Sequence, residues 1–524
     1  MPNNETEKLV RGNAAMLDVQ VSPTSRHGTA PGGDQHVDLP YLGSSQELRS
    51  WFSTVSYLDQ TLKRVATIFE TSRLLFSALR TALRAGLRDL PGPFLARFSA
   101  LYRLSLVYRG KAPFEYRKLH NKYGPVVRTE FYVVFTPYYK DKPMDSLFTT
   151  RDPTYHKNLK RPVAQLFSMT NMKNYEIYTD ECTRIFIDTM HELQGQPVDL
   201  GAWIQWYAFD VIASITFQRR FGFLENRYDV DHMIADLDFA FLYAKIIGQF
   251  PNLHPYLVGN KTLLKTLERL GIEPPDPLAR FLNITEEEIK RYDDQKKENG
   301  RTDFLAQLRA KEAKDGQVPH RDMVNHLANN ILAGSDTTAI SLRAVFYYLM
   351  KNQSTYKKLV AEIDEAEKNN QLSTFVTQAV MKEALRIHPG VAFPLERCVP
   401  PAGADLGGYK LPGGTNVSAN PAVIHVDKDI FGNDANRFRP ERWLEASPEQ
   451  LKAMDRSFLA FGYGARTCIG RNISILEMGK FIPQVLRHLD VKWAASEPEW
   501  KTDAAWFWRQ TGVHVKFGWR GKVL

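Results

Sequence analysis

The spacing of apolar residues along the chain predicts a mainly helical body. Between residues 94 and about 390 most segments carry apolar residues at helical intervals, with loops predicted at LNIT (282–285), where Thr285 and Glu288 have the spacing of a capping box, and at EPPDP. From 391 to 445 proline and glycine are frequent, and short runs such as TNVSANPAVIHV and the later VHVKFGW look like strands. We therefore predict an α+β fold that is predominantly helical, with small β-sheets.

The N-terminal part of the chain has a different pattern. Residues 1–45 are polar and rich in Gly, Pro, Ser and Asn, so we expect them to be disordered. Residues 46–93 contain a basic amphipathic segment, 58–88, followed by the stiff LPGP hinge. Two interpretations of this segment are open, a helix bound to a membrane surface and a helix packed on its own domain. No apolar run is long enough to span a bilayer, so attachment would be peripheral.

Composition narrows the classes of partner. The chain has 68 Lys and Arg against 59 Asp and Glu, a net charge of +9, which suits an acidic protein partner or an anionic membrane surface. It has no arginine-rich tract and no zinc-ligand spacing, so we expect no nucleic-acid binding. Its three cysteines, Cys182, Cys398 and Cys468, are too few for a disulfide framework and indicate a reducing compartment.

One of these cysteines, Cys468, lies in the stretch FGYGARTCIG directly before an apolar helical run. A thiol at the start of a helix is expected to have a lowered pKa, because free backbone N–H groups and the helix dipole favour the thiolate. No companion Cys or His stands at metal-ligand spacing, which disfavours zinc and iron–sulfur sites. Haem with an axial thiolate fits best, and an inert buried cysteine is the alternative.

The residues around Cys468 form a pattern with a known counterpart. Phe461, Gly464, Arg466, Cys468 and Gly470 match every fixed position of the haem-binding signature of the cytochrome P-450 family, which this sequence resembles from LPGP to its C-terminus. The fungal microsomal members are the most similar. The resemblance implies that Cys468 holds the iron of haem b and that the other four residues contact the cofactor.

The same resemblance implies a fold and exposes a gap in it. Residues 94–524 should form a cytochrome P-450 haem domain, a helix-rich body with haem between two long helices. Between the YGPVVR stretch and the helix of His156, the family has a pair of strands, a short helix and a variable loop. Here Arg128 and His156 are only 28 positions apart. We therefore expect a shortened segment, an exposed sheet edge and a cavity open to water.

A second motif lies in LANNILAGSDTTAISLRAVFYYL, at 327–349. Its apolar spacing is helical, yet five consecutive residues, Gly334–Thr338, are poor helix formers, so we expect a local opening of the helix towards a cavity. The alternative is a polar patch facing solvent. By resemblance this is the oxygen-binding stretch, in which Asp336 and Thr337 are the catalytic acid–alcohol pair and Ala333 and Gly334 lie against the cofactor.

A third motif pairs Glu383 with Arg386 at the end of a helix, before HPG. This spacing alone indicates an ordinary i,i+3 helix pair. FRPERW follows at 438–443, and in the family the Glu and Arg interlock with the Arg of that later motif, here Arg442. The resemblance thus gives these three residues a structural role rather than a catalytic one.

Haem propionates require cations and hydrogen-bond donors. By resemblance, Arg466, Arg397 in PLERCVP, His156 and Lys160 are the candidates, although Lys160 stands where the family more often has arginine. For His156 a plain position on a helix surface is the alternative. The cavity for substrate would be lined by Ala333, Val391, Phe393 and Trp506 and covered by FAFLYAKIIGQFP, which favours a hydrophobic substrate such as a polycyclic or terpenoid molecule.

These motifs imply a monooxygenase that inserts one oxygen atom from O2 into a hydrophobic small molecule of fungal secondary metabolism. No flavin- or NAD-binding glycine fingerprint appears, so electrons should come from a separate NADPH–cytochrome reductase, an acidic partner for Lys157, Lys160 and Arg471. We expect the protein on the cytosolic face of the endoplasmic reticulum membrane. A haem-thiolate isomerase or peroxide-rearranging enzyme, which the Asp336–Thr337 pair disfavours, and a catalytically impaired haem-binding variant remain alternatives.

Overall fold

The computed structural model describes most of the chain from residue 86 onward, and residues 72, 76, 79, 82 and 83 before it. The described ranges are 86–99, 101–127, 138–139, 142–250, 253–257, 260–271, 277–295, 301–316, 318–372, 377–394, 396–504 and 506–521. The predicted disordered stretch 1–45, most of 58–88 and most of the EPPDP loop lie outside these residues. Contacts divide the chain into Met1–Arg73 and Leu74–Leu524, and the fold below is that of the second unit.

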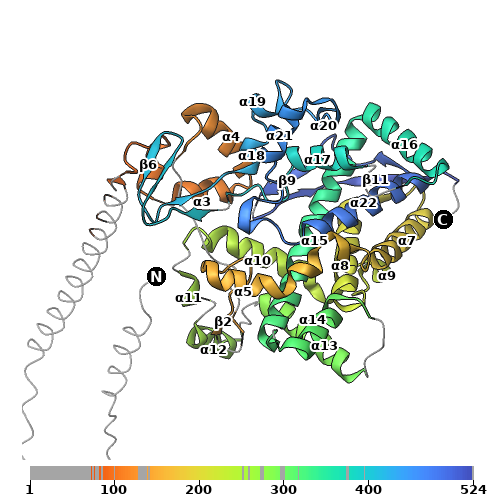
Figure 1. Ribbon diagram of the computed structural model, residues 1–524, viewed down its shortest axis with the longest axis horizontal. Helices are drawn as coiled ribbons and strands as arrows, with labels where there is room; N and C mark the ends of the chain where they lie inside the picture. Colours follow the sequence, from red (N-terminus) through yellow and green to blue (C-terminus); the bar gives the residue numbers. More distant parts are fainter. Residues whose placement is uncertain are drawn as a thin grey trace, which may run out of the picture. The chain divides into compact units, whose positions relative to one another are not determined.

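Long helices build this unit (Figure 1). Those of ten or more residues are α4 (Ala112–Tyr123), α5 (Pro153–Val163), α7 (Glu176–Glu192), α8 (Leu200–Phe217), α10 (Met233–Ile247), α13 (Pro277–Asp294), α14 (Phe304–Asp315), α15 (His320–Lys351), α16 (Gln353–Lys368), α17 (Gln378–Ile387), α21 (Pro448–Ser457) and α22 (Arg471–His488). Shorter helices connect them, namely α3 (Leu101–Tyr108), α6 (Met169–Met172), α9 (Phe223–Asn226), α11 (His254–Leu257), α12 (Lys261–Arg269), α18 (Pro421–Ile424), α19 (Lys428–Phe431), α20 (Arg442–Glu445) and the 3₁₀ turns η1 (Phe94–Arg97), η2 (Ala164–Phe167), η3 (Val230–His232) and η5 (Gly464–Arg466).

The strands form small antiparallel sheets. Within the described residues four are two-stranded, and they pair β1 (Tyr138–Tyr139) with β2 (Lys142–Pro143), β4 (Arg397–Cys398) with β7 (Asn416–Val417), β5 (Ala404–Leu406) with β6 (Tyr409–Leu411), and β9 (Lys501–Ala504) with β10 (Trp508–Thr511). The fifth has the order β3 (Pro197–Asp199), β11 (His514–Trp519), β8 (Leu489–Trp493). In it Val515 is the partner of both Val198 and Trp493. The predicted helix-rich α+β class and the strand at VHVKFGW are confirmed.

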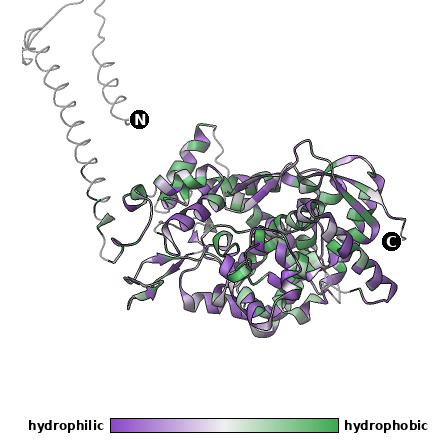
Figure 2. Cartoon of the chain, turned by 90° about the horizontal axis from the view of Figure 1, so that it is seen from above, coloured by the Kyte–Doolittle hydropathy of each residue, from purple (hydrophilic) through white to green (hydrophobic). Residues whose placement is uncertain are grey.

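The core is centred on α15, which packs most extensively against α8 and also contacts α17, α13 and α22. Almost every side chain of α8 is buried, because the helix is apolar on all sides. Other helices are hydrophobic on one face and polar on the other, and the two colours alternate along them in Figure 2. None of the helices in the described part of the chain has the length and apolar character that crossing a bilayer requires.

The predicted opening of the helix at Gly334–Thr338 is wrong, because α15 is continuous from His320 to Lys351. The hydroxyl groups bond within the helix instead of competing with it. Ser335 Oγ donates to Ile331 O at 3.0 Å and Thr337 Oγ1 donates to Ala333 O at 2.7 Å. Each carbonyl lies one turn earlier, so the backbone ladder is kept.

Two further element predictions are also wrong. LNIT is not a loop, because Thr285 lies inside α13 and donates its hydroxyl to Phe281 O at 2.7 Å. TNVSANPAVIHV keeps strand structure only at β7 and then turns into α18, because the Asn420 side chain accepts a hydrogen bond from Ala422 N at 2.9 Å and Pro421 takes the first helical position.

Candidate active site

Cys468 lies two residues before Gly470, the N-cap of α22, as predicted. Its backbone N–H donates to Phe461 O at 2.8 Å, which closes the preceding loop, and the residue as a whole is exposed. Gly464 opens the turn η5 with a φ of +69°, a left-handed conformation that favours glycine. The glycines of the motif thus shape a tight loop that presents one thiol at the start of a helix.

The electrostatics of this thiol differ from the expectation. Protein packed around Cys468 raises its pKa, whereas the backbone N–H groups of Gly470 and Arg471 and the charge of Arg471 act in the opposite direction. The predicted lowering of the pKa is therefore wrong for the protein alone, because desolvation outweighs the helix terminus. The two N–H groups aimed at Sγ still supply the stabilisation that a metal-bound thiolate requires.

One face of α15 is open next to this loop. Ala333 is exposed, and Gly334 and Thr337 are partly exposed. On the adjoining face Thr338 Oγ1 lies 3.0 Å from Ser474 Oγ in α22, which fixes α15 against the helix that follows Cys468. A Cβ on Gly334 would lie 2.7 Å from Ile212 Cγ1, so this glycine permits the close approach of α8.

Asp336 occupies a different environment from its neighbour Thr337. Its carboxylate is buried, accepts a hydrogen bond from Gln205 Nε2 at 2.6 Å and forms an ion pair with Arg509. Burial raises the pKa of Asp336 to about 6, opposed by the charge of Arg343 and the Gln205 hydrogen bond. The contact with Arg509 also favours the carboxylate. Burial thus brings the pKa of this acid closer to the range suited to proton transfer.

The four predicted propionate ligands lie close together. Arg466 donates to Leu147 O at 3.2 Å and to Thr150 O at 2.9 Å, and the nearby charge of Arg397 adds to the burial that lowers its pKa. Burial first, then Arg466 and Lys160, lower the pKa of His156. Such a group of basic side chains is suited to anionic ligands.

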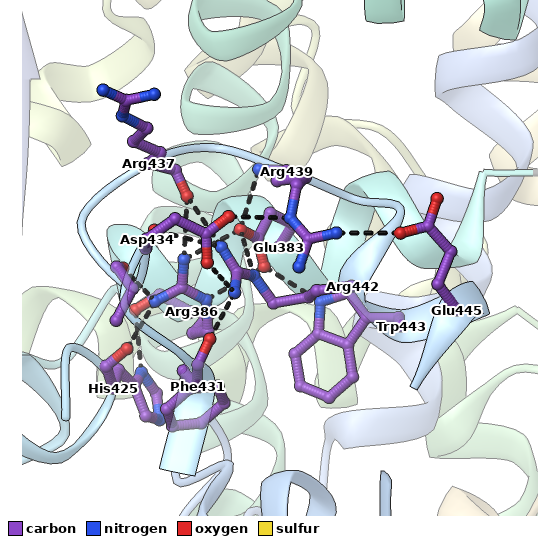
Figure 3. A network of polar contacts seen from close by, with 11 residues as sticks. Glu383, Arg386, His425, Phe431, Asp434, Arg437, Arg439, Arg442, Trp443 and Glu445 are labelled. Carbon is purple, nitrogen blue, oxygen red and sulfur yellow. Dashed lines mark hydrogen bonds and ion pairs between the residues drawn. The ribbon is translucent and has the colours of Figure 1, made fainter. Parts of the chain in front are cut away.

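The Glu383 carboxylate is the centre of a buried network (Figure 3). Arg386 contacts it through Nη2 at 2.8 Å and Nε at 2.9 Å, and Arg442 contacts it through Nε at 2.9 Å. Trp443 Nε1 and the backbone N–H of Arg439 complete the set at 3.0 and 2.9 Å. The three residues predicted to interlock are thus joined through one carboxylate.

Both arginines extend the network to the backbone of the following loops. Arg386 donates to His425 O at 2.5 Å, Ala435 O at 2.6 Å and Arg437 O at 3.0 Å, and Arg442 also pairs with Asp434 at 3.0 Å. Because each of these charges is partnered, the buried cluster is satisfied and holds the chain from α17 to α20 in one arrangement.

Two of the predicted substrate residues lie together. Phe393 and Trp506 have ring centroids 5.7 Å apart, and Phe148 meets Trp506 edge-on at 5.9 Å. Val391 is partly buried. From the predicted covering segment, which forms most of α10, Phe241 contacts Phe507 at 4.7 Å.

The sequence alone did not reveal four side chains of this site. His425 joins the Glu383 network to the cysteine loop, since its Nδ1 lies 2.9 Å from Arg386 O and its Nε2 accepts from Leu459 N at 2.8 Å. Asp434 pairs with Arg442, and Gln205 and Arg509 contact Asp336. Only Asp434 carried a local signal, because it stands eight residues before Arg442 in the same turn-rich stretch.

Comparison with known proteins decides the family. The cytochrome P-450 family model matches residues 131–517. The chain belongs to the cytochrome P-450 family. It is 35% identical to the cytochrome P-450 monooxygenase cicH of Emericella nidulans, over 84% of this chain and 95% of that protein. It is 34% identical to a cytochrome P-450 monooxygenase of Aspergillus terreus, over 79% and 92% of the two chains, and 35% identical to a pisatin demethylase of Fusarium vanettenii, over 81% and 87%.

As a cytochrome P-450 monooxygenase the protein is an oxidoreductase, and the family implies a thiolate-ligated haem. The residues present fit this group. Cys468 is exposed, the adjoining face of α15 is open, and Arg466 donates to the backbone carbonyls of Leu147 and Thr150. A Cβ added at Gly464 would have no atom within 4 Å, so the loop leaves open space beside this glycine.

Proposed function

We propose that this monooxygenase inserts one atom of O2 into a hydrophobic small molecule and receives its electrons from a separate NADPH–cytochrome reductase. The observation that carries the proposal is the junction of α15 with α22, which the contact between Thr338 and Ser474 holds together. The exposed Cys468 and the partly exposed Thr337 flank this contact. The aromatic group of Phe393, Trp506 and Phe148 supplies an apolar surface for the substrate.

Each residue has a defined task in this proposal. When bound, thiolate-ligated haem supplies the activation of O2 and the oxidation of the substrate. Cys468 Sγ would hold the iron, and Arg466, Arg397, His156 and Lys160 would neutralise the propionates. Asp336 holds a proton on its carboxyl group, and Thr337 Oγ1 passes protons onward on the open face of α15. Val391, Phe393 and Trp506 orient the substrate and exclude water.

Isotopic labelling tests this proposal. The purified holoenzyme is first screened with hydrophobic compounds for a shift of the haem spin state, and the strongest binder is then incubated with reductase, NADPH and heavy-isotope O2. We expect one labelled oxygen atom in the product. A product without the label would indicate a rearranging enzyme of the same fold, and no product from any binder would contradict turnover.

The exposed apolar side chains near the start of the described chain support a peripheral position on the cytosolic face of the endoplasmic reticulum membrane. Phe76, Leu79 and Leu83 stand at helical spacing and are exposed, as are Phe94 and Leu95. Residues 46–93 would thus anchor the haem domain 94–524. The relatives named above come from fungi, one of them a pisatin demethylase, which supports a place in fungal secondary metabolism.

A second candidate is a catalytically impaired variant with a shortened segment between 128 and 156, and a cavity favours it. A space of about 1460 Å³ lies beside β7 and is lined by Val127, the last described residue before that segment, and by residues of α4 and of the loops around α18. Within the described residues, four buried polar groups of its lining have no hydrogen-bond partner at one atom: Tyr116 Oη, Arg117 Nη2, Thr415 Oγ1 and Asn420 Nδ2. Buried donors without partners are costly, which suggests that chain is missing here.

The length of one alignment supports the loss of residues from this chain. The alignment with the Emericella nidulans protein is 486 positions long and includes 84% of this 524-residue chain. Because 84% of the chain is fewer than 486 residues, the relative has residues that this chain lacks. The family match begins at residue 131, inside the short segment. Sequencing the transcript tests this candidate, together with haem content after dialysis. A transcript that matches this sequence, with haem retained and turnover tightly coupled, would contradict an impaired variant.

A further inference from the structure

The helix α10 is fastened to the β9–β10 hairpin at two points of opposite polarity. Asp238 forms an ion pair with Arg509 of β10, and Lys245 lies 3.3 Å from Asp503 of β9. Asp238 and Lys245 are two turns apart and share one helix face, while Arg509 and Asp503 are direct partners across the hairpin. Between the two ion pairs Phe241 contacts Phe507.

One of these two ion pairs shares its arginine with Asp336, the acid of the candidate active site. Arg509 contacts Asp238 through Nη1 and Asp336 through Nη2, and its guanidinium lies 5.2 Å from the centroid of the Phe241 ring. Asp238 is 53% exposed, whereas Asp336 is buried. β10 is itself fixed to α15, because Gln510 Nε2 donates to Ile340 O at 3.0 Å. A single cation therefore stands between a fixed buried carboxylate and a solvent-exposed carboxylate on α10.

The charges that face Asp336 come from few elements. Arg343 lies on its own helix, Arg509 on β10, and α8 presents the neutral side chain of Gln205. Asp238 on α10 acts through Arg509. When α10 is docked, Asp238 shares the charge of Arg509. When α10 moves away, that charge acts on Asp336 alone, which favours the carboxylate form.

We propose that Arg509 is a positioning residue that couples the docking of α10 to the protonation of Asp336. In the docked state Asp336 takes up a proton more readily, and in the undocked state Arg509 holds it ionised. Proton delivery is thereby restricted to the state in which α10 covers the substrate. This inference rests on the proposed role of Asp336 as the proton-holding acid.

Variants of Asp238 and Arg509 should shift the pH dependence of product formation in opposite directions. We measure product formed per NADPH against pH for the holoenzyme with reductase, with a fluorogenic alkoxycoumarin as probe substrate. In Asp238→Asn the charge of Arg509 acts on Asp336 alone. The limb of the profile in which product per NADPH falls at high pH therefore moves to lower pH, by up to about one pH unit. Arg509→Gln removes the cation, so the limb moves to higher pH. Asp238 is exposed, so its variant keeps the test available if Arg509→Gln fails to fold.

Lys245→Met is the matched control, because it loosens the other fastening of α10 without a contact to Asp336. We expect it to speed probe dissociation about two- to five-fold, as Asp238→Asn does, but to leave the limb in place. Limbs that stay in place or move in the same direction in Asp238→Asn and Arg509→Gln would overturn the inference. If Asp336→Asn leaves the product formed per NADPH unchanged, the proposed proton-holding role of Asp336 fails as well. If Asp336→Asn lowers this yield while Asp238→Asn and Arg509→Gln do not shift its pH dependence, the role of Asp336 stands and the inference alone fails.

Discussion

Thr337 and Thr338 are neighbours in α15 with opposite surroundings. Thr337 is partly exposed and donates its hydroxyl to Ala333 O, whereas Thr338 is buried and contacts Ser474 on α22. A hydroxyl on the open face can reach a bound molecule, while a hydroxyl buried between two helices acts on packing. We therefore expect a role in proton transfer for Thr337 and a role in packing for Thr338.

For Thr337→Ala we expect NADPH consumption to continue while product falls and peroxide rises, because protons no longer reach the reacting oxygen in the right order. General acid–base groups typically contribute about 10²–10⁴-fold, so the product yield per NADPH should fall at least tenfold. The yields of product and peroxide per NADPH are the measurement. Thr338→Ala is the control and should lower stability with coupling preserved. Normal coupling in Thr337→Ala would remove the relay role.

Local motifs identified the residues whose partners are nearby in the chain. Cys468, Gly464 and Gly470 could be predicted because their roles depend on a tight loop and a helix start. The partners of Asp336 could not, because Gln205 and Arg509 lie 131 and 173 positions away and reach it only through the packing of α8 and β10 on α15. Their sequence surroundings carry no pattern that points to a buried acid.

At the scale of elements, the Glu383 network joins α17 to the turns before α20. Glu383→Gln removes the buried carboxylate that Arg386 and Arg442 share, so we expect a loss of about 3–5 kcal/mol in the free energy of unfolding. Denaturant unfolding measures this. Glu441→Gln is the control, because Glu441 pairs with exposed Lys358 at 3.0 Å, and it should cost at most about 1 kcal/mol. Equal losses in both variants would contradict a structural role for the network.

His425 makes the same region sensitive to pH. Burial lowers the pKa of His425 from 6.5 to about 3, helped by the charges of Arg386 and Arg117 and opposed by the hydrogen bond that the ring donates to Arg386 O. The neutral ring accepts a hydrogen bond from Leu459 N. The unfolded chain binds a proton below pH 6.5 that the folded protein does not, so stability is complete above pH 6.5 and is lost as pH falls towards 3, by about 1.4 kcal/mol per unit.

The measurement is the free energy of unfolding between pH 6.5 and 5, compared with His425→Asn. The asparagine amide can donate to Arg386 O but does not titrate, so the variant should be less stable at neutral pH and lose stability less steeply on acidification. An unchanged slope would mean that His425 does not contribute to the acid sensitivity.

Elements were predicted where the apolar period was sustained and missed where tertiary contacts decided. The helical body and the strand β11 followed from spacing. The continuity of α15 did not, because each serine and threonine hydroxyl bonds the carbonyl one turn earlier and Asp336 is paired by other elements. α18 was read as strand because valine and isoleucine favour strands, while the Asn420 cap and Pro421 impose a helical turn.

At the scale of the whole molecule, the start of the described chain is divided between packing and exposure. Leu87 and Leu90 pack against Val399 and Leu411, whereas Phe76, Leu79 and Leu83 are exposed. The last turn of the segment therefore belongs to the body of the protein. The exposed part before it is available to a membrane surface.

Removing residues 1–83 should move the protein from the membrane pellet to the supernatant, because the exposed apolar side chains of Phe76, Leu79 and Leu83 are lost while Leu87 and Leu90 stay packed. Fractionation of expressing cells measures this, and the haem content of the soluble form controls for folding. Membrane association that is unchanged by the truncation would show that the attachment lies elsewhere.

The most direct test of the account is the reduced, CO-bound absorption spectrum of the holoenzyme with and without Cys468. The wild-type protein should show the strongly red-shifted band of thiolate-ligated haem, and Cys468→Ser should lack it and form no product, since an alcohol does not replace the soft anionic donor. Cys398→Ser, which changes the exposed cysteine of β4, should keep both. A thiolate-type spectrum retained in Cys468→Ser would contradict the assignment of the iron ligand and with it the site described above.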